Sequence, residues 1–482
     1  MIVLSIPREV KSFFSKTTAK CSRPIQRALA PMVLAFLLAP HRRCLKTIAG
    51  EVLGRRCHVA TISRRLTNPQ WRTRDWYVDL YDGLLGEVNA WERRQAKGKR
   101  RQWIVAIDTT YHSTMSEQME NLIVMSKRRN PARKTTRQHA FLMGLVLTDR
   151  GARLPLPRKS YYTADYCRKH KRRFRTTVEL AAAMLRELRV PDDVDVIVTF
   201  DSAFDAGAIH KACRKRHFHA VFPLDPNRVL AHTPAQDAAR LAGEKVVAWT
   251  RHWSRQQFAL LELAVDNEDH VFARRRHVDN LRVKKTKRRY AVAARQATVS
   301  KLGDCLIVAS YKENPKVQLL PGQSAEWWAY HRAPVSYRRE DCRKPARWHR
   351  KVLACTDPTA TARQVVEWYE VRWQVELFFR ELKSRMQFEC YVLMQFEAVE
   401  RYLDLLLMGL LLLEQQRLRD MQQSGATIGA VWVQARATDR LRMLESLCQG
   451  WNVRWIEHRL RTVGGRRRLL RELIRQAPCQ VA

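Results

Sequence analysis

The segment Glu367–Met386 carries Tyr369, Arg372, Glu376 and Lys383 on one side of an expected helix. At about 100° per residue, these four side chains fall within an arc of about 60°. Apolar side chains occupy the neighbouring arc: Val371, Val375, Phe378, Phe379, Leu382 and Met386. A solvated helix face needs no such concentration of one carboxylate, two cations and a phenol. The pattern instead favours a site that handles a metal ion and a phosphate.

Two expected strands end in an aspartate. The run "WIVAID" ends at Asp108, and "VDVIVTFD" ends at Asp201. The end of a buried strand can present a carboxylate to a crevice, although such an aspartate often only caps the helix that follows. Together with Glu376 they make three carboxylates, whose hard oxygen atoms suit Mg²⁺ or Mn²⁺.

These residue types suit phosphoryl transfer on DNA. Two divalent ions about 3.5–4 Å apart can activate an attacking oxygen and stabilise the leaving oxygen of an in-line displacement. Tyr369, Arg372 and Lys383 add hydrogen-bond donors for the phosphate oxygens of a DNA strand.

The order of the expected elements predicts an α/β domain around these acids. Strands are expected at 103–108, 139–149, 152–162, 193–201 and 217–225, and helices at 175–189 and 205–216. Three strands followed by helix, strand, helix and strand are typical of an α/β fold rather than of a β-sandwich.

The texture of the sequence changes along the chain and predicts five regions. These are a helical region at 1–98, the α/β core at 99–224, a β-rich segment at 225–345, the rest of the core at 346–395, and a helical region at 396–482. Within the β-rich segment we expect strands at 245–253, 257–265, 290–299, 304–313 and 327–337. The simplest interpretation is one α/β domain interrupted by a β-rich insertion.

The composition points to a polyanionic partner. The chain has 482 residues with 88 Lys and Arg against 47 Asp and Glu, a net charge of +41. Such an excess favours nucleic acid over a membrane surface. No apolar run reaches the roughly 18 residues of a membrane span, and no signal peptide is evident. The 11 cysteines include no CxxC pair, which favours reduced thiols in a cytosolic protein, and Cys57–His58 lacks a second pair for zinc.

The segment 44–67 is the best candidate for recognising a DNA sequence. It has the spacing of buried positions in a helix-turn-helix, at Ile48, Val52, Val59 and Ile62. Its second helix would expose Arg64 and Arg65 toward a groove. A plain helical bundle fits the same spacing. The basic segments 274–289 and 459–475 are expected to follow phosphates, with solvated charged faces as the alternative.

The motifs resemble those of a known family. The pattern Tyr-x2-Arg-x3-Glu-x6-Lys is complete within Glu367–Met386, "IDTT" surrounds Asp108, and "FDSAFD" contains Asp201 and Asp205. The chain thus resembles the DDE transposases of bacterial insertion sequences, in the branch called the insertion-sequence-four family. A role of Asp205 in capping the next helix is the alternative to a role in the second acidic block.

The resemblance implies an RNase H-like catalytic core with a β-rich insertion ahead of the third acid. It implies that Asp108, Asp201 and Glu376 bind two Mg²⁺ or Mn²⁺ ions, and that Tyr369, Arg372 and Lys383 grip the terminal phosphates. It also implies cleavage at each transposon end, attack by the freed 3′-OH, often through a hairpin, and transfer to target DNA. A homodimer would pair the two ends in the bacterial cytoplasm, at the nucleoid.

A tryptophan in or near the insertion stacks on a flipped base in some members of that family. Trp327, Trp328 and Trp348 are the candidates here, with an ordinary core or surface role as the alternative for each.

Two other functions fit part of the sequence. A metal-dependent nuclease or junction resolvase on the same kind of core would use the three acids without needing a long insertion. A non-catalytic DNA-binding derivative of a transposase could lose an acid freely, whereas all three are present here.

Overall fold

A computed structural model describes residues 8–19, 21–38, 45, 58–114, 116–125, 136–231, 243–267, 284–315, 326–328, 347–386, 388, 391–421 and 431. The predicted tail at 459–475 lies outside these residues, as do most of the basic segment 274–289 and residues 46–57 of the predicted helix-turn-helix.

The described part of the N-terminal region is helical, as predicted. Its helices are α1 (Arg8–Ala19), α2 (Arg23–Leu38), α4 (Val59–Thr67) and α5 (Thr73–Ala96). Along α5, Trp76, Leu80, Leu84 and Val88 are buried at the spacing of one helix face. The helix ends at Lys97, which has a positive φ of 50° and turns the chain into the first strand.

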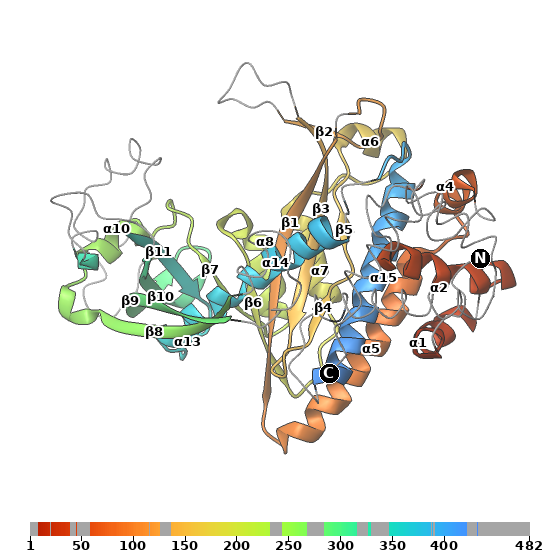
Figure 1. Ribbon diagram of the computed structural model, residues 1–482. Coiled ribbons are helices and arrows are strands. Elements are labelled where there is room, and N and C mark those ends of the chain that lie inside the picture. The colour runs from red at the N-terminus through yellow and green to blue at the C-terminus, as the bar shows by residue number, and fades with distance from the viewer. Residues whose placement is uncertain are drawn as a thin grey trace.

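The core is one large mixed sheet of 11 strands (Figure 1). Its first half consists of β1 (Arg101–Thr114), β2 (Ile123–Met125), β3 (Thr136–Leu147), β4 (Arg153–Pro155), β5 (Lys159–Ser160), β6 (Val194–Thr199) and β7 (His219–Pro223). Strand β3 pairs antiparallel with β1 and with β2, β4 and β5, whereas β6 runs parallel to β1 and β7 parallel to β6. The predicted α/β class is therefore confirmed.

Short helices connect these strands. They are α6 (Ala164–Lys169), α7 (Thr177–Glu187), the 3-10 turn η2 (Ser202–Phe204) and α8 (Gly207–Lys215). Helix α7 begins with a capping box in which Thr176 and Glu179 satisfy each other's backbone N–H groups. Helices α7 and α8 pack against each other, α7 also against β3 and α8 against β7.

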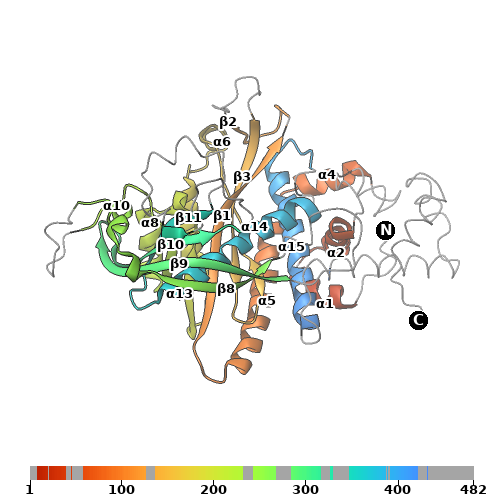
Figure 2. The same ribbon diagram turned by 60° about the vertical axis from the view of Figure 1, so that its left-hand side comes forward.

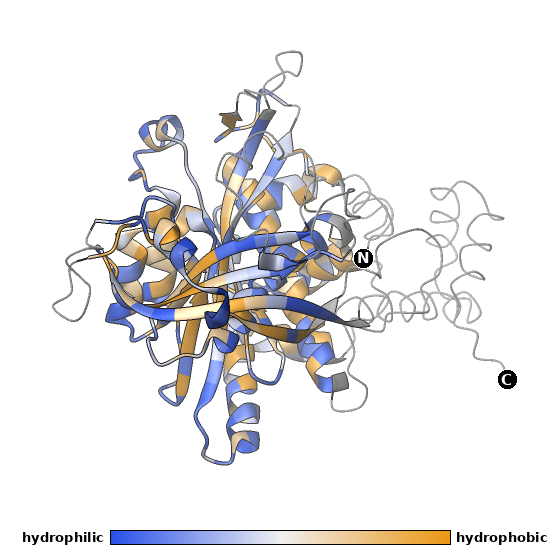
Figure 3. Ribbon diagram, turned by 90° about the vertical axis from the view of Figure 1, so that its left-hand side faces the viewer, coloured by the Kyte–Doolittle hydropathy of each residue, from blue (hydrophilic) through white to orange (hydrophobic). Residues whose placement is uncertain are grey.

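The second half of the sheet continues the first without a break. It contains β8 (Ala259–Asn267), β9 (Lys284–Val299), β10 (Gly303–Glu313) and β11 (Trp348–Cys355). Strand β11 pairs antiparallel with both β7 and β10, so the β-rich segment extends the core sheet rather than forming a second one. Figure 3 views this side and shows helices banded in hydrophilic and hydrophobic colours, as amphipathic helices are.

One predicted strand in this segment is wrong. Residues 245–253 form α10 (Val246–Trp249) and the 3-10 turn η3 (Thr250–His252), with η4 (Arg255–Gln257) after them. Val246, Trp249, Thr250 and Trp253 are buried. Their spacing of three and four residues is that of a helix, and it outweighs the β-branched and aromatic composition of the stretch.

The chain then returns to the core. It forms α13 (Ala362–Val371), α14 (Trp373–Arg380), the π-helical turn η6 (Glu381–Arg385) and the long α15 (Phe396–Met421). Helix α14 covers β1 and β3, and α13 lies along the neighbouring strands. Figures 1 and 2 show α15 beside α5, where it also packs against α2 and α4. Among the helices that the structure describes, none combines the length and apolarity that a bilayer crossing requires.

Candidate active site

Asp108 lies within β1, on the face that α14 covers. Its Oδ1 accepts a hydrogen bond from the backbone N–H of Thr109 at 2.7 Å, and its Oδ2 lies 3.4 Å from Nη1 of Arg372. The side chain is 24% exposed, which is partial burial with an opening to solvent. Strand β1 continues to Thr114, so Asp108 does not end the strand as the sequence predicts.

Asp201 comes just after the end of β6, the strand that pairs in parallel with β1. The parallel pairing joins Arg101 to Val194 and Ala106 to Thr199, a constant offset of 93 residues. Asp108 comes two residues after Ala106 and Asp201 two residues after Thr199, and the charge of Asp201 raises the pKa of Asp108. The Oδ1 of Asp201 accepts a hydrogen bond from the N–H of Ser202 at 2.8 Å and so caps the η2 turn. Its side chain is otherwise exposed.

Glu376 lies on α14 and is joined to Asp108 through Arg372. Nη2 of Arg372 lies 2.5 Å from Oε1 of Glu376, one helical turn away, while Nη1 reaches Asp108. The guanidinium therefore stands between two of the three carboxylates. Glu376 is 32% exposed and Arg372 is 12% exposed, so the pair lies at the border between the core and solvent.

The three carboxylates affect one another electrostatically. Burial raises the pKa of Asp108, and the negative charges of Asp201 and Glu376 raise it further. The N–H of Thr109 and the Arg372 guanidinium oppose this rise. Burial would lower the pKa of Arg372, but the charges of Tyr369, Glu376 and Asp108 raise it overall. An additional positive charge at this place would therefore be stabilised.

The described residues contain no group of three or more His, Cys, Asp or Glu side chains that could hold a metal ion as they stand. Positive charge between Asp108 and Glu376 comes from Arg372 instead. The chemistry of the donors nevertheless fits a divalent cation, because carboxylates are hard oxygen ligands, and the charges of Asp201 and Glu376 raise the pKa of Asp108. The predicted metal role of these acids stays a prediction.

The segment Glu367–Met386 is not the single helix that the sequence predicts. A turn at Arg372 separates α13 from α14, and the last turn is a π-helix. Helix α13 contacts β1 and β6 to β10, whereas α14 contacts β1 and β3. A π-turn widens the helix and alters the direction of the following side chains, and such turns are frequent at functional sites.

Tyr369 is buried, with 6% of its surface exposed. Its hydroxyl lies 3.3 Å from Nζ of Lys351 on β11, whose ammonium also stands 4.9 Å from the centre of the tyrosine ring. The guanidinium of Arg372 lies 5.7 Å from the same ring. The ring of Tyr369 thus lies next to two cations, Lys351 and Arg372. Lys351 was not predicted, and the burial pattern along β11 has no regular alternation that could have indicated it.

Lys383 lies on η6 at the far end of the segment. Its Nζ donates a hydrogen bond to the backbone carbonyl oxygen of Tyr111 on β1, at 2.7 Å. Tyr111 is three residues beyond Asp108, so the ammonium of Lys383 contacts the strand that carries the first acid. The role of Lys383 in holding DNA phosphates stays a prediction.

A partly buried ion cluster joins the β-rich segment to α13 and was not predicted. The carboxylate of Glu370 binds Lys312 of β10 at 2.9 Å and Arg288 of β9. Burial would raise the pKa of Glu370, but Lys312 and Arg288 hold it below its usual value. Glu370 follows Tyr369 directly, and its charge on an otherwise apolar helix face was the available signal.

Asp205 is buried in a structural ion cluster. It lies 2.8 Å from Nε2 of His210 and 2.7 Å from Nη2 of Arg228, and it accepts a hydrogen bond from the N–H of Asp225 at 3.2 Å. Burial would raise the pKa of Asp205, but the hydrogen bonds from His210 and Arg228 lower it to about 2. The residue before α8 that occupies the N-cap is Ala206, so Asp205 does not cap that helix.

The predicted recognition helix is present in part as α4. Arg64 is exposed, whereas Arg65 turns inward, 3.9 Å from the sulfur of Met32 and 5.9 Å from the ring centre of Trp71. Ile62 is fully buried as predicted, but Val59 is 40% exposed and is not a buried position. The first turn of α4 has solvent on that side, which explains the difference.

Trp348 is buried, with 5% of its surface exposed, at the start of β11. It belongs to an aromatic cluster with Tyr311 and Trp327, against which Trp328 packs. The three candidate tryptophans therefore gather at one place in the β-rich half of the sheet. Their role in base stacking stays a prediction, as do the DNA contacts of Arg64 and Arg65.

Residues 175–412 match the family model of the transposase DDE domain. The matched range includes Asp201 and Glu376, and Asp108 precedes it. This match supports a DDE transposase, an enzyme whose substrate is DNA and whose family depends in general on divalent metal ions. No curated protein matches the chain.

Proposed function

We propose that this chain is the cut-and-paste transposase of an insertion sequence of the insertion-sequence-four family, with Asp108, Asp201 and Glu376 as its catalytic acids. The observation that carries the proposal is that acids far apart in the sequence act on one another's surroundings. Arg372 pairs with both Asp108 and Glu376, and the charge of Asp201 raises the pKa of Asp108.

The topology supports an RNase H-like core for this enzyme. Three antiparallel segments, β1, β3 and β4, are followed by two strands, β6 and β7, that run parallel to β1. The two aspartates belong to the two central neighbours of this arrangement. Active sites of open α/β sheets commonly lie at such strand ends, where carboxylates can face a crevice.

The three acids would hold divalent cations, Mg²⁺ or Mn²⁺, which when bound activate an attacking oxygen and stabilise a leaving oxygen. Cationic side chains of the protein would stabilise the negative charge on the scissile phosphate. Arg372 lies between two of the acids and can turn its donors to the non-bridging oxygens of a scissile phosphate. Lys351, whose ammonium lies over the ring of Tyr369, adds a second positive charge near Arg372.

The reaction proposed for this site cuts DNA at each end of the element and joins the freed 3′-OH to target DNA. A hairpin at the element's end is proposed as the intermediate of release. The net charge of +41 supports a long contact with the DNA backbone. Two protomers are proposed to hold the two ends together, since each end needs a catalytic site.

The first experiment uses purified full-length protein and a duplex that ends in the element's own inverted repeat. We expect cleavage at the element boundary with Mg²⁺ or Mn²⁺ and none in excess EDTA. A denaturing gel separates linear from hairpin products. Cleavage that persists in EDTA would contradict the metal assignment, and cleavage without regard to the repeat would favour a nuclease instead.

Lys383 provides a second test of the site. We expect Lys383→Ala to weaken binding of the cleaved end about tenfold, because one ammonium-to-phosphate contact contributes about 1–2 kcal/mol. Titration of Mn²⁺ measured by calorimetry should give an unchanged affinity, since the lysine binds no metal. A fall in metal affinity would argue against the phosphate role. Lys169→Ala, an exposed lysine beside Glu120, is the matched control.

A further inference from the structure

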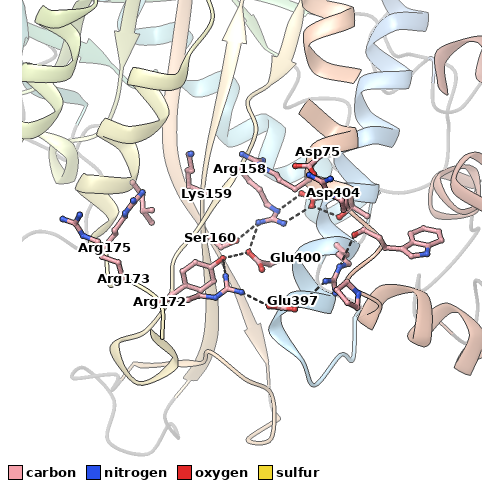
Figure 4. Close-up of a pocket in the computed structure, with 18 residues that line it drawn as sticks. Asp75, Arg158, Lys159, Ser160, Arg172, Arg173, Arg175, Glu397, Glu400 and Asp404 are labelled. Atoms are coloured by element: carbon pink, nitrogen blue, oxygen red, sulfur yellow. Dashed lines mark hydrogen bonds and ion pairs between the residues drawn. The ribbon is translucent and has the colours of Figure 1, made fainter. Parts of the chain in front are cut away.

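A cavity of about 660 Å³ lies apart from the acids, between the start of α5, β5, the loop before α7 and the start of α15 (Figure 4). None of Asp108, Asp201 and Glu376 lines it. Its charged lining consists of eight cations and four acids: Arg72, Arg74, Arg158, Lys159, Arg172, Arg173, Arg175 and Arg401, against Asp75, Glu397, Glu400 and Asp404. The cations outnumber the acids, and one of the cations, Lys159, pairs with Glu187 outside the lining.

The acids of this cavity are already paired with cations. Arg158 binds Glu400 at 3.0 Å and Asp404 at 2.8 Å, and Arg172 binds Glu397 at 2.7 Å. The fourth acid pairs with an arginine three residues before it on the same helix turn. Each of the four carboxylates thus has a paired cation, although the charge of Asp404 also acts on Arg74.

Arg74, in the first turn of α5, is one of the remaining arginines. Its Nη1 is buried and makes no hydrogen bond to any residue that the structure describes. Burial lowers the pKa of Arg74, and the neighbouring Arg158 lowers it further, while Asp404 opposes the change. A buried guanidinium without an acceptor is costly, and an anion entering the cavity would supply that acceptor.

Arg173 and Arg175 supply positive charge on the open side of the cavity. Both are exposed, on the loop before α7. In Figure 4 they stand across the cavity from Asp404, and no dashed line joins them to another residue drawn. A ligand held between them and Arg74 would be contacted by guanidinium groups on both sides. Guanidinium forks bind phosphate oxygens in pairs, which favours phosphate over a simple halide.

The cavity also adjoins the exposed helix α4. Arg401, in its lining, donates hydrogen bonds to the carbonyl oxygens of Leu66, in α4, at 2.7 Å and of Trp71 at 3.2 Å. DNA that contacts the exposed Arg64 of α4 would therefore pass close to the mouth of the cavity. This neighbourhood favours backbone phosphates of DNA over a free phosphate anion.

We propose that this cavity binds backbone phosphates of the transposon DNA, outside the catalytic site, through Arg74, Arg173 and Arg175. The assignment of the phosphates to DNA rests on the proposed transposase function. A free polyphosphate anion offers the same chemistry, and the experiment separates the two sources.

The test compares the double variant Arg173→Ala/Arg175→Ala with the unaltered full-length protein. We expect its dissociation constant for an inverted-repeat duplex to rise about tenfold, and the slope of log affinity against log salt to fall by about two. The control Arg168→Ala/Arg363→Ala removes the same charge from exposed arginines that pair with acids on their own helices. The control should change the slope less than half as much.

Two further measurements, with inorganic pyrophosphate and with the variant Arg74→Gln, distinguish DNA phosphates from a free polyphosphate anion as the ligand of the cavity. If the cavity serves DNA, Arg74→Gln also weakens duplex binding while its unfolding temperature without ligand stays at or above the original, since an unpaired buried charge is removed. A rise of the unfolding temperature by pyrophosphate, together with DNA affinity and salt slope equal to the controls, would overturn the DNA assignment. If the variants bind DNA as the controls do, and pyrophosphate leaves the unfolding temperature unchanged, the cavity is not a phosphate site. Metal-dependent cleavage by the unaltered protein reports separately on the proposed function.

Discussion

Replacing Glu376 with glutamine is expected to lower the rate of end cleavage at least about a thousandfold, which corresponds to about 4 kcal/mol in the barrier. The amide preserves the shape of the side chain but removes the negative charge that would hold a divalent ion. It also removes one of the charges that raise the pKa of Asp108, so the charge balance of the whole site changes. Single-turnover cleavage of a labelled end in Mg²⁺ measures the effect.

Glu367→Gln is the matched control for this variant. Glu367 lies on α13 in an exposed pair with Arg363 at 2.9 Å, a kind of contact that contributes at most about 1 kcal/mol. Both variants should bind the inverted repeat and unfold at temperatures close to that of the unaltered protein. If Glu376→Gln cleaves the DNA as fast as Glu367→Gln does, Glu376 is not one of the catalytic acids.

Replacing Asp205 with asparagine is expected to destabilise the fold by about 3–5 kcal/mol without a direct effect on chemistry. Asp205 is fully buried between His210 and Arg228, and the amide would leave the arginine without its carboxylate. Asparagine can still accept the hydrogen bond from the N–H of Asp225, so the loss isolates the charge. Urea unfolding at neutral pH measures the free energy, and single-turnover cleavage under folded conditions should remain within a few fold.

The pH dependence of the Asp205 contribution follows from its lowered pKa. A carboxyl whose pKa falls from its ordinary 3.8 to about 2 on folding stabilises the folded state fully above pH 3.8. The contribution is lost as the pH falls from about 4 toward 2, so the difference between the two proteins should shrink there. Asp195→Asn, in an exposed pair with Arg100, is the control and should cost at most about 1 kcal/mol. An equal cost for both variants would deny Asp205 its structural role.

The sequence predicted the elements that carry the acids because burial on two sides leaves a strong local signal. Strands β1 and β6 are apolar runs in the sequence, and the aspartates in or just after them are visible there. Their register could not be read, because it depends on which strands become neighbours in the sheet. The pairing of Ala106 with Thr199, two residues before each aspartate, is known only from the folded sheet.

The segment around Glu376 shows where periodicity stops being informative. A uniform 100° step put Tyr369 on the same arc as Arg372 and Lys383, yet Tyr369 is buried beneath Lys351 while Lys383 reaches Tyr111. The segment is interrupted at Arg372 and ends in a π-turn, and its two helices share β1 but otherwise contact different strands. Local sequence contains no information on those neighbours.

Long-range charge pairs were likewise invisible to sequence reasoning. Glu370 binds Lys312 and Arg288, which lie 58 and 82 residues away in the chain. The helical period of Val246 and Trp249, in contrast, was present in the sequence, but their β-branched and aromatic character predicted a strand. Composition and period disagreed there, and burial followed the period.

The central claim is that Asp108, Asp201 and Glu376 bind the same metal ions. Fe²⁺ in place of Mg²⁺, with ascorbate and peroxide, generates hydroxyl radicals that cut a protein chain next to the bound metal. Our account predicts cuts close to residues 108, 201 and 376 together, all suppressed by excess Mg²⁺ and all absent in Glu376→Gln. Cuts near only one of these positions, or cuts that excess Mg²⁺ leaves unchanged, would contradict it.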